Sequence, residues 1–248
     1  MENIAEILPF FALALAGVLG GFINITAGGG SLIAIPALLL MGLPENVANG
    51  TLRIAILVQV AVACAKYLHA GRVPLKPLRT ILPLSLVGAL YGAYIATQIS
   101  NAAFKPVLSL VIIGSALVVA LRPSSTGKRI ALPNILLWPA LFAVGFYGGF
   151  IQISVGYLIL FALILCAGQD LVQANIYKPF VVLTYTPFAL FIFAKQGLVV
   201  WEYGLCLALG QGLGGYIAAT ANLKYGEKII RPILLAVALF SLGLIVLR

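Results

Sequence analysis

Charged side chains are scarce in this chain: only 8% of its 248 residues are Asp, Glu, Lys or Arg, and 62% are hydrophobic. A soluble domain carries roughly 25% charged residues because its surface has to be solvated. This chain has too few charges to cover a surface that faces water. We therefore expect its outer surface to face lipid, with the bilayer as a partner.

Carboxylates are scarcer still, and all six lie at or near the ends of hydrophobic segments: Glu2, Glu6, Glu45, Asp170, Glu202 and Glu227. None lies in mid-span, so the usual proton relay or sodium cage of a coupled transporter is missing. An anion that leaves an inside-negative cell gains about 2.3 kcal/mol per charge per 100 mV. If the chain moves an anion out of the cell, we hypothesise that this export runs on the membrane potential. Flux that follows a pH gradient and ignores the electrical potential would refute this hypothesis.

Groups that bind metals or catalyse reactions are also few. The single histidine, His69, lies at a predicted helix end beside Arg72, and Cys64, Cys166 and Cys206 stand alone in apolar segments. Isolated cysteines of this kind pack between helices, whereas metal and redox sites need closely spaced ligands. A membrane enzyme needs a nucleophile, metal ligands or a carboxylate pair in its core. We therefore predict no enzyme activity, no metal and no cofactor.

The net charge of +9 is compatible with a nucleic-acid partner, but no basic stripe interleaved with aromatic residues is present. Ten of the fifteen basic residues lie instead at short connections between hydrophobic runs, as the positive-inside rule requires. Residues 1–8 contain two acids and no basic stretch, so we expect a first membrane helix there rather than a cleavable signal peptide. These features predict a multi-pass protein of a bacterial-type inner membrane that binds no nucleic acid.

Long apolar runs make up most of the chain. Several last 18 residues or more, for example 104–121 and 229–247, and this length indicates helices rather than the alternating segments of about ten residues in a membrane β-barrel. The hydrophobic segments are 7–27, 31–42, 47–69, 79–98, 103–121, 135–156, 157–168, 171–194, 200–221 and 229–247. They predict an all-α polytopic membrane protein with about eight full spans and two short half-helices.

The segments 31–42 and 157–168 are too short to cross the membrane. Twelve residues at 1.5 Å each cover about 18 Å, against a hydrocarbon core of about 30 Å. Each segment follows a helix that ends in glycine, at Gly28, Gly29 and Gly30 in one case and at Gly156 in the other. We expect a helix broken inside the membrane at both places, with a half-helix that returns from the break.

An internal repeat relates the two parts of the chain. Residues 17–28 (GVLGGFINITAG) align with residues 145–156 (GFYGGFIQISVG). Polar residues coincide in this alignment and beyond it, pairing Asn24 with Gln152, Thr26 with Ser154, and Asn49 with Asn175. We predict two homologous transmembrane repeats, 1–121 and 135–248, joined by a polar cytoplasmic linker at 122–134.

The two repeats can be inverted or parallel. If the hairpin at 7–42 begins and ends on one side of the membrane, the repeats are inverted and the basic residues divide 10:3 between inside and outside. If the hairpin crosses once, the repeats are parallel and the division is 9:4. Both divisions obey the positive-inside rule. We favour inversion, because about 35 residues of helix are too long for one crossing.

Polar residues gather at the predicted breaks. Backbone groups freed by a break are tolerated only where they line a cavity or face protein, and the N-terminus of the following half-helix favours an anion. Transporters with duplicated halves commonly bind substrate at such places. The predicted substrate-binding residues here are Asn24, Thr26, Gly28, Gly29, Gly30, Ser31, Gln152, Ser154, Gly156 and Tyr157. The alternative is that the hydroxyls bond to helix carbonyls and the glycines allow close packing.

Two cations lie inside hydrophobic segments, Arg53 a few residues after Asn49 and Lys178 a few residues after Asn175. A charge within a span is costly and usually functional, although Arg53 lies only about 9 Å from its helix start and could snorkel to the interface. Two cations beside helix N-termini predict an anionic substrate with several oxygens. The site is completed by Asn49, Thr51, Asn175 and Tyr177, with Gln59, Thr184 and Tyr185 as further neutral donors.

The run from Gly21 to Pro44 (GFINITAGGGSLIAIPALLLMGLP), followed by ANGT at 48–51, resembles the TauE/SafE sulfite-exporter family, also called the toluene sulfonate uptake permeases. Residues 197–216 resemble that family's second half, so the resemblance covers essentially the whole chain. It implies a two-repeat permease that moves small sulfur oxyanions or organosulfonates, mostly outward, and that contacts substrate through the glycine-rich turn. The second half departs from the first, because Tyr157 follows Gly156 where the first half has a glycine cluster.

Together these observations predict a secondary transporter that exports small sulfur-containing anions, such as sulfite or organosulfonates, bound at the interface of the two repeats. The alternatives are an anion channel, or a carrier of a different small oxyanion or carboxylate. A scaffold would not need a broken helix or a charged interior. Its phenotype would survive loss of Arg53 and Lys178, whereas a transporter would lose flux.

Overall fold

The computed structural model describes residues 2–104, 106–107 and 136–246, and within these ranges the regular structure is helical. The helices are α1 (Glu2–Thr26), α2 (Ser31–Leu40), α3 (Glu45–His69), α4 (Leu75–Gln98), α6 (Leu137–Phe150), α7 (Val155–Leu165), α8 (Leu171–Lys195), α9 (Trp201–Tyr225) and α10 (Glu227–Val246). The predicted all-α class is therefore confirmed for the described residues. Most of the hydrophobic segment 103–121 and the whole linker 122–134 lie outside them.

Five of the described helices are long and apolar enough to cross a membrane: Ile7–Thr26 of α1, α3, Lys76–Gln98 of α4, α8 and α9. The helices α2, α6 and α7 are apolar but shorter, with 10, 14 and 11 residues. This set confirms a polytopic membrane protein. The eight full spans and the internal repeat stay predictions.

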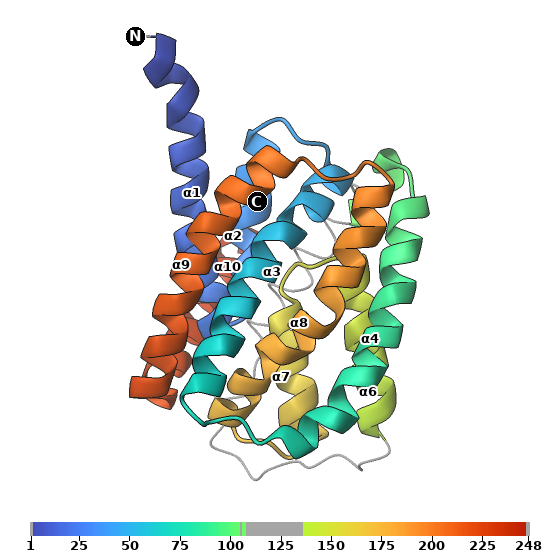
Figure 1. Cartoon of the computed structure of the whole chain (residues 1–248), viewed down its shortest axis with the longest axis vertical. Helices are drawn as coiled ribbons and strands as arrows, with labels where there is room; N and C mark the ends of the chain where they lie inside the picture. Colours follow the sequence, from blue (N-terminus) through green and yellow to red (C-terminus); the bar gives the residue numbers. More distant parts are fainter. Residues whose placement is uncertain (1, 105, 108–135, 247–248) are drawn as a thin grey trace.

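Two helical hairpins enter the molecule from opposite ends (Figure 1). The hairpin of α1 and α2 begins and ends at the end that carries the N-terminus, and the hairpin of α6 and α7 begins and ends at the other end. The longer helices α3, α4, α8 and α9 run between the two ends beside these hairpins. This is the arrangement that an inverted repeat would have, and it brings both hairpin turns to the middle of the molecule.

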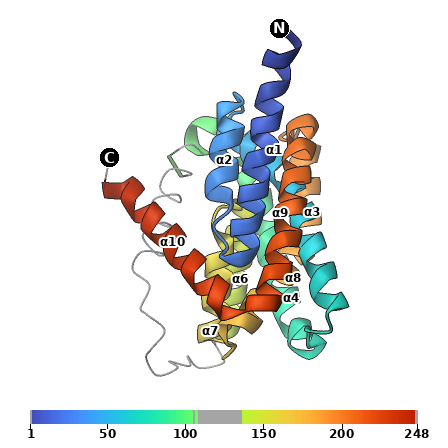
Figure 2. The same ribbon diagram turned by 90° about the vertical axis from the view of Figure 1, so that its left-hand side faces the viewer.

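The first helix of each hairpin packs against a long helix from the other side of the linker, α1 against α9 and α6 against α4. Figure 2 shows α1 beside α9. A Cβ atom on Gly21 would lie 2.8 Å from Gln211 Cα, and one on Gly145 would lie 2.7 Å from Ser85 Cα. A side chain at these positions would collide with the neighbouring backbone, so glycine lets the helix backbones approach closely, as is typical in membranes. The glycines in them are Gly17, Gly21, Gly210 and Gly214 in the first pair and Gly88, Gly92, Gly145 and Gly149 in the second.

The first break lies at residues 27–30, as the glycine cluster predicts, but the second lies earlier than predicted. The helix α6 ends at Phe150 rather than near Gly156, and α7 begins at Val155. The left-handed backbone conformation falls on Gly28 in the first break (φ 98°) and on Ser154 in the second (φ 55°). Because the second break has no glycine cluster, Ser154 makes the turn, and Gly156 lies in the first turn of α7.

Candidate functional site

The two breaks touch each other at Gly28 and Gly156. A Cβ atom on Gly28 would lie 2.9 Å from Gly156 Cα, so no side chain fits between the two backbones. Beside this contact, the Ser31 hydroxyl donates to the carbonyl of Gln152 (3.1 Å) and accepts from the backbone N–H of Ser154 (3.2 Å). Ser31 begins α2 and Ser154 precedes α7, so the N-termini of both half-helices meet in the interior. The N-terminus of a helix carries roughly half a positive charge because the peptide dipoles align.

Arg53 on α3 lies at the second break and is fully buried. Its Nη1 donates to the carbonyl of Gly148 (3.3 Å), and its Nη2 donates to the carbonyl of Gly149. The neighbouring Asn49 donates through Nδ2 to the carbonyl of Phe150 (2.9 Å). These are the last three carbonyls of α6, which have no partner within the helix. Arg53 therefore caps α6 in the interior and does not snorkel to the interface.

Arg53 also joins the polar groups around this break. Its Nη1 lies 3.4 Å from Gln152 Oε1, and Gln152 Nε2 donates to the hydroxyl of Tyr185 (3.3 Å). The guanidinium carbon of Arg53 lies 4.3 Å from the centre of the Phe193 ring. This cation–π contact stabilises the buried guanidinium group.

Lys178 on α8 lies at the first break, and it is also buried. Its Nζ donates to the carbonyl of Ile25 (3.0 Å) and to Asn175 Oδ1 (2.6 Å). The carbonyl of Ile25 is one of the last of α1, and it also accepts from Nδ2 of Asn222 (3.4 Å). Arg53, which precedes the linker in the sequence, thus caps α6, which follows it, and Lys178, which follows the linker, caps α1, which precedes it.

Neither cation has a carboxylate partner in the described part of the chain. The four acids whose side chains are described are not buried, and the ion pair found there joins Glu227 to Arg231. A buried charge without a counter-charge is costly. The middle of the molecule therefore combines two basic side chains with two helix ends that carry positive partial charge.

Several buried polar atoms near the breaks have no hydrogen-bond partner within the described residues. They are Nε of Arg53, Nε2 of Gln59, Nδ2 of Asn175, Oγ1 of Thr26 and Oγ of Ser154. Each unpaired buried donor is destabilising by about 1–3 kcal/mol. All five can donate a hydrogen bond, so they suit a ligand made of acceptor oxygens.

Most of the predicted site residues lie at or beside the two breaks. They are Thr26, Gly28, Gly29, Gly30, Ser31, Asn49, Arg53, Gln152, Ser154, Gly156, Tyr157, Asn175 and Lys178. Asn24 is near them, with its Nδ2 donating to Gln59 Oε1 at 3.3 Å. The Ser31 hydroxyl bonds across to the other break rather than back to its own helix.

Two predicted residues have structural partners away from the breaks. Thr51 Oγ1 accepts from the backbone N–H of Val200 (3.0 Å), just before α9, and the Tyr177 hydroxyl donates to the carbonyl of Pro74 (3.2 Å), just before α4. The Thr184 hydroxyl bonds to its own helix, as polar residues within helices often do.

Two residues that the sequence did not single out, Asn222 and Tyr67, join the first break. Asn222 Nδ2 donates to the Tyr67 hydroxyl (3.0 Å) as well as to the carbonyl of Ile25. Asn222 lies close to the end of α9, next to Leu223 and Lys224, so the sequence pattern there is that of an interfacial residue. Only the packing of α9 against α1 brings it to the break.

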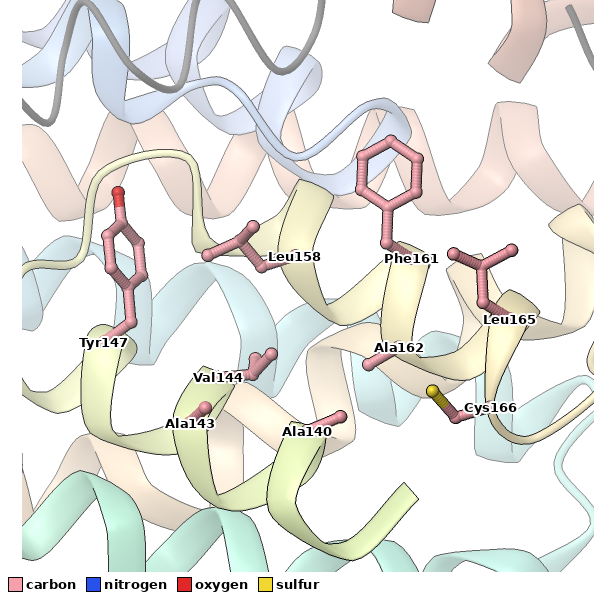
Figure 3. Close-up of a pocket in the computed structure, with 9 residues that line it drawn as sticks. All are labelled: Ala140, Ala143, Val144, Tyr147, Leu158, Phe161, Ala162, Leu165 and Cys166. Atoms are coloured by element: carbon pink, nitrogen blue, oxygen red, sulfur yellow. The ribbon is translucent and has the colours of Figure 1, made fainter. Parts of the chain in front are cut away.

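An apolar groove of about 460 Å³ lies between α6 and α7 (Figure 3). Ala140, Ala143, Val144 and Tyr147 line it from α6, and Leu158, Phe161, Ala162, Leu165 and Cys166 line it from α7 and the residue that follows. The Tyr147 hydroxyl is already bonded to the carbonyl of Ile153 (2.7 Å). The described lining of the groove offers an anion no charged partner.

Comparisons of the sequence with known proteins find a protein family and several relatives. The sequence profile of the family described as sulfite exporter TauE/SafE matches residues 13–245. "Probable membrane transporter protein ORF9" of a Sinorhizobium species is 30% identical over 243 residues, which cover 96% of this chain and 92% of the relative. "Probable membrane transporter protein YfcA" of Escherichia coli K12 is 27% identical, covering 91% of this chain and 85% of the relative. A "probable membrane transporter protein" of Haemophilus influenzae is 28% identical, covering 89% and 88%. No solved structure matches the chain.

Proposed function

The chain belongs to the sulfite exporter TauE/SafE family, and from this membership and the buried charges at its two breaks we propose that it exports small sulfur-containing anions, such as sulfite or organosulfonates. It is a multi-pass transporter of the bacterial inner membrane, as the family and the names of its relatives indicate. The anion would bind where the two breaks meet.

One observation carries the proposal: Arg53 and Lys178 are buried at the breaks, and no carboxylate of the described residues lies beside them. Their attraction to backbone carbonyls offsets only part of the cost of removing two charges from water. An anion with several oxygens would supply the missing counter-charge. It would also accept hydrogen bonds from N–H groups of both side chains that do not already bond to carbonyls or amides. The N-termini of α2 and α7 would add to the same attraction.

The capping arrangement suggests how binding could couple to movement. Each cation comes from one side of the linker and holds the carbonyl end of the helix broken on the other side. An anion that draws Arg53 or Lys178 toward itself would loosen these caps, and with them the contacts between the two parts of the protein. Alternating access in transporters of duplicated architecture is largely a movement of this kind, one repeat against the other.

The distribution of exposed charge supports an orientation. The basic end is the end where α3 and α9 finish and α4 and α10 begin; it carries Lys66, Arg72, Lys76, Arg79, Lys224, Lys228 and Arg231, whereas the described residues of the opposite end contribute Lys195. By the positive-inside rule the basic end faces the cytoplasm. An anion bound from this end would gain free energy on leaving an inside-negative cell.

A thermal-stability screen of the purified protein tests the proposal. Sulfite, sulfate, thiosulfate, methanesulfonate and acetate are compared at constant ionic strength. A ligand at 100 times its Kd stabilises the folded state by about 2.7 kcal/mol, so a sulfur oxyanion or sulfonate should raise the melting temperature measurably. Arg53→Lys should weaken this shift because lysine cannot form the same fork of hydrogen bonds.

Arg79→Lys is the matched control. It makes the same chemical change as Arg53→Lys, but at an exposed position of the basic end. It should leave the anion shift intact. An equal loss in both variants would mean that the shift does not come from the breaks. A shift with acetate and none with any sulfur anion would replace the proposed cargo by a carboxylate.

A further inference from the structure

A second cavity, of about 490 Å³, opens at the basic end. It lies between the start of α8, the end of α9, the start of α10 and the loop after α3, and its lining includes Arg72, Asp170, Gln173, Asn222 and Glu227. This volume falls within the range of about 300–1,000 Å³ that is typical of small-molecule sites. We call this cavity the basic-end mouth.

The lining of the mouth holds one base, Arg72, and two acids, Asp170 and Glu227, at an end of the protein whose described charged residues are mostly basic. Asp170 accepts a hydrogen bond from the backbone N–H of Gln173 (2.8 Å) as the cap of α8, and Glu227 pairs with Arg231 at 3.0 Å. Both carboxylates therefore have positive or donor partners already. Arg72 is exposed and forms no ion pair with the described residues.

Asn222 connects the mouth to the first break. Its side chain is only 3% exposed, yet it lines the mouth. Its Nδ2 lies 3.4 Å from the carbonyl oxygen of Ile25, and Lys178 Nζ lies 3.0 Å from the same oxygen. The two nitrogens are therefore no more than 6.4 Å apart, the sum of these distances. Asn222 Oδ1 is buried with no hydrogen-bond partner within the described residues.

We propose that the basic-end mouth is the cytoplasmic access path for the anion, and that Asn222 is the positioning residue that passes the anion from the mouth to Lys178. This inference rests on the proposed function, since it assigns a route and a further residue to the same transport. An amide can donate and accept, and it adds no charge of its own. Both hydrogens of Asn222 Nδ2 are donated, to the carbonyl of Ile25 and to the hydroxyl of Tyr67, so the anion would take the place of Ile25, the longer of the two bonds (3.4 Å).

Accessibility labelling tests the path. Cys64, Cys166 and Cys206 are replaced by alanine, and Gln173→Cys places one thiol in the lining of the mouth. Membrane vesicles of both orientations are treated with impermeant methanethiosulfonate reagents, one anionic and one cationic, with and without sulfite. We expect labelling from the cytoplasmic side only, faster with the anionic reagent, and slowed by sulfite.

Asn222 is tested by flux. Asn222→Asp places a carboxylate within reach of Lys178, which would pair with it and compete with the anion, so sulfite flux should fall by at least about tenfold. Asn222→Ser keeps a neutral hydrogen-bonding group and should retain much more flux. Gln196→Asp adds the same charge at the exposed opposite end of α8 and should carry sulfite at the unmodified rate.

The outcomes separate this inference from the proposed function. If the unmodified protein neither binds nor carries sulfite or methanesulfonate, the proposed function fails. If it carries sulfite but Gln173→Cys is labelled only from the outer side, or sulfite leaves the labelling unchanged, the path is wrong. If Asn222→Asp carries sulfite as fast as Gln196→Asp, Asn222 has no positioning role.

Discussion

One methyl group is enough to test the contact between the two breaks. In Gly28→Ala the new Cβ would lie 2.8 Å from the carbonyl carbon of Gly156 and 2.9 Å from its Cα, where backbone cannot move aside cheaply. Gly28 also has a φ of 98°, in the left-handed region that a side chain disfavours. The substitution therefore combines two separate costs.

Each cost can be estimated and measured alone. The left-handed conformation costs about 1–2 kcal/mol for a residue with a Cβ, and overpacking costs about 1–3 kcal/mol, so Gly28→Ala should lose about 2–5 kcal/mol. Gly42→Ala carries the conformational cost only, because Gly42 has a φ of 85° and nothing within 4 Å of its Cβ position. Gly156→Ala carries the packing cost only, with its Cβ 2.5 Å from Gly28 Cα and no positive φ.

Unfolding of the three variants and the unmodified protein in one detergent, followed by circular dichroism, supplies the free energies. Gly28→Ala should be the least stable, and its loss should approach the combined losses of the other two. Sulfite flux should fall in Gly28→Ala and Gly156→Ala and survive in Gly42→Ala, which lies outside the breaks. If Gly28→Ala is no less stable than Gly42→Ala, the breaks are not in contact and the description of the site is wrong.

Three further predictions concern other parts of the site. Ser31→Ala removes both hydrogen bonds between the start of α2 and the second break, so the free energy of unfolding should fall by about 1–3 kcal/mol; unchanged stability in a detergent titration would contradict it. Thr51→Val removes a partner of Val200 only, so stability should fall by about 1 kcal/mol while the sulfite Kd stays the same; a changed Kd would return Thr51 to the binding site. Sulfite efflux from proteoliposomes should rise with an inside-negative potential set by potassium and valinomycin; efflux that follows only a pH gradient would exclude transport on the membrane potential.

Much of the fold could be predicted because apolar run length and glycine clusters have direct structural consequences. The short segments and the first break at Gly28, Gly29 and Gly30 follow from these two signals. The second break was misplaced because Ser154, rather than a glycine, takes the left-handed conformation there. That choice depends on the packing around Ser154, which the sequence pattern does not contain.

The site was harder to predict, because polar side chains close together on one helix have different partners. Thr51 and Arg53 are two residues apart on α3, yet Arg53 reaches the second break while Thr51 bonds to Val200. The burial of two cations could be expected from their position in apolar segments. Their role as caps of α6 and α1 could not be expected from the sequence, because it depends on how α3 packs near α6 and how α8 packs near α1. Asn222 was missed for the same reason.

The most direct test of anion transport at the breaks is the efflux of radiolabelled sulfite from proteoliposomes containing Lys178→Met or Lys195→Met. Both residues are lysines of α8, but Lys178 is buried beside the first break and Lys195 is exposed at the helix end. We expect Lys178→Met to lose at least about tenfold in rate, equivalent to about 1.4 kcal/mol, and Lys195→Met to match the unmodified protein. Equal sulfite efflux from the two variants would contradict an anion held by the buried cations.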